Sequence, residues 1–343
     1  MKSSGIGGQA VIEGIMMRSG NDIAVAVRKP DGNIEVGKQK TVSPKDKNKI
    51  FGWPIIRGIV SFIFSLVIGI KTLTFSASFY MDEEETGKEK KENGKGEDAL
   101  MFGTVAVSLV LAIAIFMILP YWASTGIVKL FGSDSAVLVA VIEGVLKLAI
   151  FLAYISLISL MKDIRRTFQY HGAEHKCINC IESGHELNVD NVMKASKEHR
   201  RCGTSFIFFV LFISIIFFII LDVLLSLDPS FDTRLFINKL ARMGIRLLLI
   251  PVIAGLSYEF IQWAGNSGSK VAAVLSKPGL WIQGLTTKEP DRDMAEVAIT
   301  AVEAVFDWRD YLRKQGIEVS EPEVVTEPET VSEPETAEIG EEE

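Results

Sequence analysis

The sequence predicts an α-helical membrane protein. We expect about four transmembrane helices, one in-plane or half-inserted helix, a small cytoplasmic N-terminal β unit and a C-terminal amphipathic helix. First, several windows of about 20 residues carry almost no charge, and a helix of that length crosses the bilayer core. Second, polar residues gather in the N-terminus, one loop and the tail, so the overall hydrophobic content is only 48%. Third, Met1–Lys49 is polar and basic, and no secretory signal is expected there.

Residues 1–53 are expected to form the β unit. Ile23–Val27 is rich in β-branched residues, and the favoured turn pair Asp31-Gly32 follows it. Apolar residues then alternate with polar ones, as in a strand with one buried face. The glycine-dense stretch 5–14 lacks the spacing of a phosphate loop. It therefore indicates either tight turns beside a strand or a close backbone approach to a ligand or another domain.

Residues 54–80 are apolar but ambiguous, because Arg57 precedes the apolar run and Lys71 interrupts it. Two stronger transmembrane hairpins follow, at 100–160 and 204–264. Each hairpin holds two long apolar segments. These four predicted spans are Leu100–Tyr121, Ala136–Leu160, Thr204–Leu227 and roughly Met243–Trp263.

Two further segments are charged and lack apolar periodicity. The stretch 81–99 mixes both signs of charge and is expected to be an exposed, flexible linker. In 315–343, Glu-Pro steps recur and no Lys or Arg occurs, which predicts a disordered acidic tail.

The orientation follows from basic residues close to the spans. Residues 1–57 contain ten Lys and Arg and the 161–203 loop contains eight, whereas the two outer connections contain one and two. The N-terminus and this loop should therefore both be cytoplasmic, and the hairpin 100–160 supplies the even number of crossings between them. Residues 54–80 are accordingly expected to lie in the membrane plane or to insert halfway. We expect a multi-pass protein of the cytoplasmic membrane with both termini cytoplasmic.

Residues 265–314 are expected to be a cytoplasmic segment with an amphipathic helix. Thr286–Glu289, followed by Pro290, is typical of a helix start. An apolar stripe at helical spacing continues from there to about Leu312. This helix should pack on the β unit or on the 161–203 loop.

The 161–203 loop holds every histidine and cysteine of the chain. Within it, His171-Gly172-Ala173-Glu174-His175 matches H-x-x-E-H, the inverted form of a zinc-peptidase motif. On a helix the two histidines lie one turn apart on one face and can chelate a single ion. Glu174 is then placed to take a proton from a bound water. A third ligand is expected from His199 or Cys202.

The pair Cys177 and Cys180 has C-x-x-C spacing, which leaves other interpretations open. A closed structural zinc site could combine this pair with two of His185, His199 and Cys202. A structural disulfide is not expected in the reducing cytosol, and a redox pair would need a βαβ context. In the remaining alternative no metal binds, and the histidines are core or interface groups.

Ionisable residues inside the predicted spans are a second signal. They are expected to face the bundle interior, to pair with one another, or to line a wet cavity, because charge is costly in lipid. Inter-helix ion pairing for assembly and a transport path are the two interpretations. The residues are Glu143, Lys147, Asp222, Arg246 and Glu259.

With these residues in view, the chain resembles the YqhQ-like family of bacterial polytopic membrane proteins, which are often described as metal-dependent enzymes. The resemblance runs from about Gly5 to Val305. Its motifs stand in the same order at 7–18, 170–176, 199–204, 251–259, 278–281 and 285–287. The residues that the resemblance carries over are His171, Glu174, His175, His199 and Cys202. Cys177, Cys180 and His185 fall outside the family pattern, which counts against the closed site.

Beside ion or solute transport through Glu143, Asp222 and Glu259, two functions therefore remain open. In the first, a divalent metal ion, most simply zinc, is held by His171, His175 and His199 or Cys202, and Glu174 is the general base of a hydrolysis. In the second, the protein is a non-enzymatic membrane scaffold, or a factor in protein insertion or envelope assembly, and the cluster only holds the loop's shape. The lipid bilayer is the expected partner, with a membrane protein or a second copy as further possibilities. No nucleic-acid partner is expected.

Overall fold

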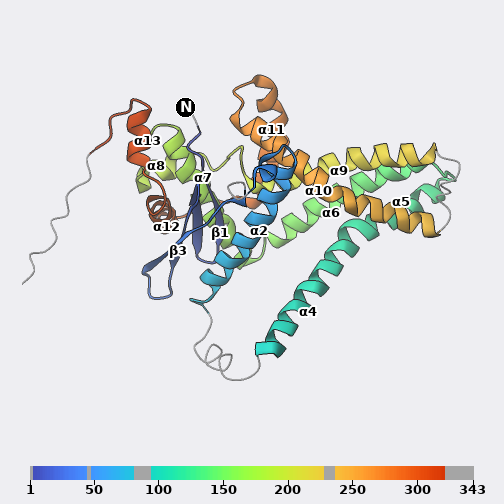
Figure 1. Cartoon of the computed structure of the whole chain (residues 1–343), viewed down its shortest axis with the longest axis horizontal. Coiled ribbons are helices and arrows are strands. Elements are labelled where there is room, and N and C mark those ends of the chain that lie inside the picture. The colour runs from blue at the N-terminus through green and yellow to red at the C-terminus, as the bar shows by residue number, and fades with distance from the viewer. Residues whose placement is uncertain (1–2, 45–47, 81–93, 228–235, 321–343) are drawn as a thin grey trace, which may run out of the picture.

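The computed structural model describes residues 3–44, 48–80, 94–227 and 236–320. Most of the expected linker 81–99 and most of the expected tail 315–343 lie outside these ranges. Figure 1 shows a small sheet with helices packed around it and a group of long helices that extend away from it.

The predicted β unit is confirmed as a four-stranded antiparallel sheet. Its strands are β1 (Ile6–Val11), β2 (Gly14–Ser19), β3 (Asp22–Arg28) and β4 (Ile34–Lys40), and they follow one another in sheet order. The expected hairpin around Asp31-Gly32 joins β3 to β4, with Arg28 opposite Ile34. The glycine-dense stretch forms β1 and the turn into β2.

The two faces of the sheet pack against different helices, because successive side chains of a strand point to opposite sides. Ile15 and Met17 belong to the core shared with α7 (Lys162–Glu182) and α12 (Arg292–Glu303). Met16 and its neighbours in β3 belong to a second core, which includes Ile68 of α2 (Ile56–Ala77). The sheet is therefore covered on both faces, by α2 on one and by α7 and α12 on the other.

Five helices in the described part of the chain are long and apolar enough to cross a membrane. They include α6 (Ala136–Ile158), α9 (Gly203–Ser226) and α10 (Phe236–Asn266), and α2 is also among them. In Figure 1, α6, α9 and α10 extend in a common direction, whereas α2 crosses that direction and lies over the sheet. The number of crossings predicted from the basic residues stays a prediction.

The first hairpin differs from expectation at both ends of its first helix. α4 (Gly94–Ile113) begins inside the expected linker. It continues through a π-helical turn, η2 (Ala114–Ile118), into α5 (Leu119–Leu130). The helix therefore continues past the predicted end of the span at Tyr121, because Pro120 is the second residue of α5, where it does not stop the helix. The connection to α6 shortens to residues 131–135.

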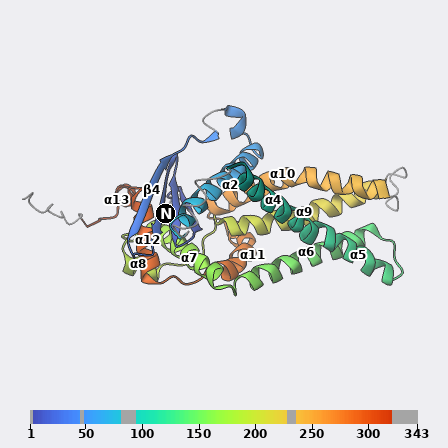
Figure 2. The same ribbon diagram turned by 90° about the horizontal axis from the view of Figure 1, so that it is seen from below.

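The 161–203 segment is mostly helical and not a loop. α7 occupies residues 162–182, and a short helix, α8 (Val189–Lys194), packs against it. Figure 2 shows α7 beside the sheet, at the base of the long helices.

The helix start expected at Thr286–Glu289 is wrong. α11 (Lys270–Thr286) ends there, and α12 begins only at Arg292, where the Asp291 side chain accepts a hydrogen bond from the Met294 N–H. The intervening backbone is held against α7, because the Lys288 N–H donates to the Phe168 carbonyl over 2.9 Å. α12 packs on β2, β3 and α7, and a last helix, α13 (Trp308–Lys314), follows it.

Candidate metal centre

One face of α7 gathers the predicted ligands. His171, Glu174 and His175 occupy positions i, i+3 and i+4, which share a face of an α-helix. Glu174 and His175 are 5% and 1% exposed, so this face points into the protein. The helix thereby presents two imidazoles and a carboxyl group to the junction of the sheet with the long helices.

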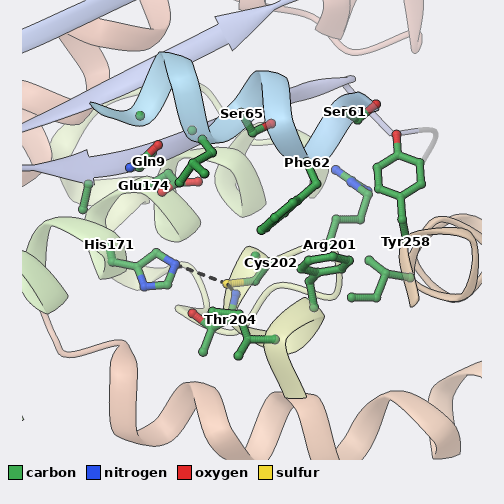
Figure 3. A pocket seen from close by; sticks show the side chains of 18 of the residues that line it. Gln9, Ser61, Phe62, Ser65, His171, Glu174, Arg201, Cys202, Thr204 and Tyr258 are labelled. Carbon is green, nitrogen blue, oxygen red and sulfur yellow. Dashed lines mark hydrogen bonds between the residues drawn. The ribbon is translucent and has the colours of Figure 1, made fainter. Parts of the chain in front are cut away.

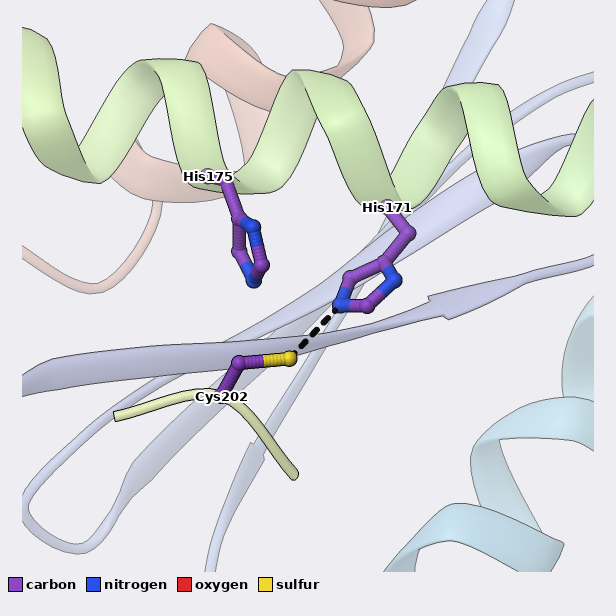
Figure 4. A group of neighbouring side chains, drawn as sticks. All are labelled: His171, His175 and Cys202. Atoms are coloured by element: carbon purple, nitrogen blue, oxygen red, sulfur yellow. Dashed lines mark hydrogen bonds between the residues drawn. The ribbon is translucent and has the colours of Figure 1, made fainter. Parts of the chain in front are cut away.

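The third member of the cluster is Cys202. Its sulfur lies 3.3 Å from Nε2 of His171, and the ligand atoms of His171, His175 and Cys202 all lie within 4.8 Å of one another (Figure 4). Cys202 caps the N-terminus of α9, and its sulfur accepts a hydrogen bond of 3.3 Å from the Thr204 N–H. A helix N-terminus and a backbone N–H both favour a thiolate.

Backbone carbonyls fix the orientation of both imidazoles. Nδ1 of His171 donates to the Thr286 carbonyl over 3.0 Å, and Nδ1 of His175 donates to the Lys197 carbonyl over 2.6 Å. Because a carbonyl can only accept, Nδ1 carries the proton in each ring. Nε2 of both histidines is therefore the nitrogen available to a ligand, an arrangement typical of metal-binding histidines.

The thiol and His171 shift each other's ionisation. Burial raises the pKa of Cys202, but His171 and His175 outweigh burial and hold it well below the usual value. Burial likewise lowers the pKa of His171, but the neighbouring Cys202 outweighs it and raises the value to about 9. The pair therefore favours a thiolate beside an imidazolium, and a cation arriving at the site competes with the His171 proton.

Glu174 carries an unsatisfied group at the site. Its Oε2 is buried and has no hydrogen-bond partner among the described residues. Burial raises the pKa of its carboxyl, and the neighbouring His171 and His175 only partly offset this. The carboxyl group lies against the backbone of β1, where a Cβ built at Gly8 would stand 3.0 Å from its Cδ. An unpaired buried carboxyl costs free energy, so its presence indicates a missing partner.

His199 lies close to the cluster but outside the three-ligand group. Its Nε2 is 3.8 Å from Oε2 of Glu182, and its ring centroid is 5.5 Å from that of His175. Its backbone is held by Gln283, whose Oε1 accepts from the His199 N–H and whose Nε2 donates to the His199 carbonyl. His199 is thus placed to support the segment that carries Cys202.

Cys177 and Cys180 lie on another side of α7, in the core shared with α12 and the sheet. Burial raises the pKa of both thiols, to about 11 for Cys180. Among the described residues, the group with ligand geometry contains neither of them. The closed site that the C-x-x-C spacing left open therefore has no geometric support.

Three groups that orient the site were not identified from the sequence as parts of it. They are the carbonyls of Thr286 and Lys197 and the side chain of Gln283. Gly172, inside the H-x-x-E-H motif, was the one sequence signal that another segment packs closely on α7 here. A Cβ there would overlap the Lys288 carbonyl, so glycine allows the chain carrying Thr286 to approach α7.

The ionisable residues of the spans form a separate group. Arg246 of α10 donates to both carboxylate oxygens of Glu143 over 2.6 and 2.8 Å, and to Asp222 of α9 over 2.8 Å. Lys147 lies 2.8 Å from Glu143, one turn along α6. Arg242 extends the group, 3.3 Å from Asp222. These contacts fit the interpretation as inter-helix ion pairing.

Glu259 lies apart from this group. It pairs with Arg57 at the start of α2 and accepts a hydrogen bond of 3.2 Å from the Ile55 N–H. Close packing of Gly58 on Gly255 brings the same two helices together. Glu259 therefore joins α10 to α2.

The donor set fits a zinc ion. Zinc binds imidazole nitrogen at about 2.0–2.1 Å and thiolate at about 2.3 Å, which at tetrahedral angles places the two ligands roughly 3.5 Å apart. The 3.3 Å between Nε2 of His171 and the Cys202 sulfur is close to that value. Three protein ligands leave a fourth position open, as in catalytic zinc sites.

The site opens on a cavity of about 740 Å³. Its walls come from β1, α2, α7, α9 and α10, and Figure 3 shows His171, Glu174 and Cys202 on one side of it. Phe62, Ser65 and Arg201 also line it.

Known proteins give a family but no activity. The family model described as "Protein of unknown function (DUF1385)" matches residues 53–308. A relative described as "Uncharacterized protein YqhQ" from Bacillus subtilis (strain 168) is 35% identical over 302 residues, which cover 85% of this chain and 89% of the relative. No solved structure matches the chain. The resemblance inferred from the motifs is confirmed.

Proposed function

The chain belongs to the DUF1385 family, and we propose that it is a metal-dependent hydrolase of the cytoplasmic membrane. One zinc ion binds His171, His175 and Cys202, and Glu174 is the general base.

The geometry of the ligand atoms is the observation that carries this proposal. The ligand atoms of His171, His175 and Cys202 lie within 4.8 Å of one another. Nδ1 of each histidine is hydrogen-bonded to a backbone carbonyl, which leaves Nε2 for a ligand. A histidine pair that served only as core packing would not need its second nitrogens turned toward a buried thiol. The unpaired oxygen of Glu174 beside them gives the proposed ion a neighbouring base.

Zinc at this site would supply a polarised water and a Lewis acid for the bond that is broken. Glu174 would take the proton of the water and pass it to the leaving atom, so that water adds across the bond. This role needs the carboxylate form, which a nearby dication favours over the neutral form that burial favours. The carbonyls of Thr286 and Lys197 would hold the two imidazoles in place throughout.

The membrane arrangement is part of the same proposal. We place α4–α5, α6, α9 and α10 across the bilayer, with both termini and α7 on the cytoplasmic side. α2 lies in the plane of the membrane, supported by its packing over the sheet and by its exposed residues Phe62, Leu66 and Ile70.

Metal content of the purified protein tests the proposal. The wild type should hold about one zinc ion per chain, as in other single catalytic sites. The His171→Ala/His175→Ala variant should lose it, and Cys180→Ser, a matched change in the core of α7, should keep it. The same content in all three proteins would contradict the metal site.

The scaffold alternative makes a different prediction for Glu174. A non-enzymatic protein needs the ligands for shape but not the base. Glu174→Gln would then retain its zinc and complement a deletion strain fully, while the double histidine variant would fail. The exposed apolar face of α2, with Ile63 and Val67, is the observation that favours this alternative, because it could bind another protein.

A further inference from the structure

The cavity beside the metal centre has a polar and an apolar part to its lining. His171, Glu174 and Cys202 supply polar groups. Phe62 and Leu66 of α2 and Ile207 of α9 supply apolar side chains. A few polar groups converging on an apolar cavity are typical of a ligand site.

The apolar lining comes from α2 and α9. Phe62, Leu66, Ile70 and Ile207 line the cavity and are 44%, 54%, 59% and 50% exposed. The ring of Phe62 lies 5.5 Å from that of Phe206, so side chains of the two helices touch at the cavity. Because we place α9 across the bilayer and α2 in its plane, these exposed apolar residues would face lipid and not water.

The shape of the cavity selects among occupants that reside in lipid. The cavity has a volume of about 740 Å³, and Phe62 projects into it from α2 (Figure 3). A transmembrane helix is about 10 Å across with its side chains and cannot bend around this ring, whereas a flexible acyl chain can.

The face of α2 that lines the cavity carries short side chains, which leave room for an acyl chain. Ser61, Ser65 and Gly69 succeed one another at intervals of four residues and all line the cavity. Their spacing places them on one helix face. At the end of this row, Gly69 packs against the side chain of Gln9 in β1, close to Glu174.

We propose that this cavity binds a membrane phospholipid, with an acyl chain between α2 and α9 and the head group at His171, Glu174 and Cys202. The lipid enters sideways from the bilayer. This inference rests on the proposed function and names its substrate class: a membrane lipid is the molecule that is hydrolysed.

Photocrosslinking tests the position of the acyl chain. The full-length protein would be placed in nanodiscs of phosphatidylethanolamine and phosphatidylglycerol, with a phosphatidylglycerol that carries a diazirine on its acyl chain. After illumination, mass spectrometry would locate the adducts. We expect them on Phe62, Leu66 and Ile207.

Two matched variants separate a bound lipid from lipid around the protein. Ser65→Trp fills the cavity and should lower the adducts at Leu66 and Ile207 at least about tenfold, because it displaces several methylene groups. Ile63→Trp introduces the same side chain on α2 outside the cavity and should leave those adducts unchanged. Adducts that are as frequent on Ile63 and Val67 as in the cavity, or that Ser65→Trp does not reduce, would overturn the proposal.

A peptide occupant is a separate outcome. A photoreactive amino acid at Leu66, illuminated in cells, should yield a lipid adduct. A polypeptide adduct in its place would overturn the proposal.

Zinc measured on the same samples keeps this result apart from the proposed function. Stoichiometric zinc without cavity adducts would refute lipid binding but not the metal site. Cavity adducts without zinc would refute the metal site but not lipid binding.

Discussion

Two glycines set the close contacts that shape the metal centre. Gly8 lets β1 approach Glu174, and Gly172 lets the Lys288 carbonyl approach α7. A side chain at either position would push apart elements that hold a base or a ligand. The chemistry of the site thus depends on residues that have no functional group.

Gly8→Ala tests this dependence. The added Cβ would stand 2.6 Å from the Met16 carbonyl oxygen, 2.8 Å from the Met17 sulfur and 3.0 Å from Cδ of Glu174. We expect a loss of about 1–3 kcal/mol in the free energy of unfolding, the usual cost of overpacking. Gly7→Ala is the matched control, because nothing lies within 4 Å of its Cβ. Denaturant unfolding in detergent measures both, and equal stability of the two variants would refute the packing argument.

Glu182 gives a pH dependence of stability. Burial raises the pKa of its carboxyl, but His199, Ser4 and Arg201 outweigh burial and lower it from 4.5 to about 2. The folded state therefore gains stability that is fully present above pH 4.5 and is lost as the pH falls toward 2. The gain is at most about 3–4 kcal/mol, at about 1.4 kcal/mol per pKa unit.

The Glu182→Gln variant should lack this loss. Unfolding curves between pH 5 and pH 2.5 would compare it with the wild type and with Glu198→Gln, a change of an exposed carboxylate. Parallel declines of the wild type and Glu182→Gln would show that Glu182 contributes nothing to the acid sensitivity.

The sequence predicted which candidate ligands share one face of α7, but it left the third candidate open between His199 and Cys202. Helical periodicity alone places His171, Glu174 and His175 on one face. It cannot choose between His199 and Cys202, because that choice depends on how a non-helical segment turns into α9. The Cys202 side chain caps that helix and so points back to the cluster.

At the scale of elements, ion pairs hold the long helices together. Arg246 of α10 contacts Glu143 of α6 and Asp222 of α9. Sequence alone named these three residues as costly in lipid but could not pair them, since their contacts join helices far apart in the chain.

Arg246→Met should destabilise the protein strongly. Its removal leaves two buried carboxylates without their shared partner, and breaking a buried pair costs about 3–5 kcal/mol. Leu247→Met, the neighbouring exposed position, should cost less than about 1.5 kcal/mol. Unfolding by sodium dodecyl sulfate would measure both. If Arg246→Met were no worse than its neighbour, the pairing would not stabilise the bundle.

The place of α2 in the membrane is not decided by its hydropathy alone. α2 is long and apolar enough to span, yet Ile68 packs it on the sheet and Arg57 pairs it with Glu259 of α10. Hydropathy measures composition, whereas the position of a helix in a membrane also depends on what its other face contacts.

Labelling of introduced cysteines tests the position of α2. If α2 does not cross the membrane, Lys88→Cys should react with an impermeant maleimide only after permeabilisation. Asp134→Cys, between α5 and α6, should react in intact cells. Reaction of Lys88→Cys in intact cells would show that α2 crosses.

At the scale of the whole molecule, the sequence located the apolar segments and the β unit, because hydropathy and turn chemistry are local. It could not give the arrangement of α2, α7 and α12 around the sheet, which depends on contacts between distant segments. It also placed the start of α12 too early, because the close approach at Gly172 holds residues 287–291 extended.

We propose above all that this arrangement builds a zinc site at the edge of a membrane cavity. Zinc can be measured by plasma mass spectrometry in protein that is purified without chelators. We expect about one zinc ion per chain in the wild type and in Cys180→Ser, and none in His171→Ala/His175→Ala. Folded wild-type protein that holds no metal would refute the zinc site.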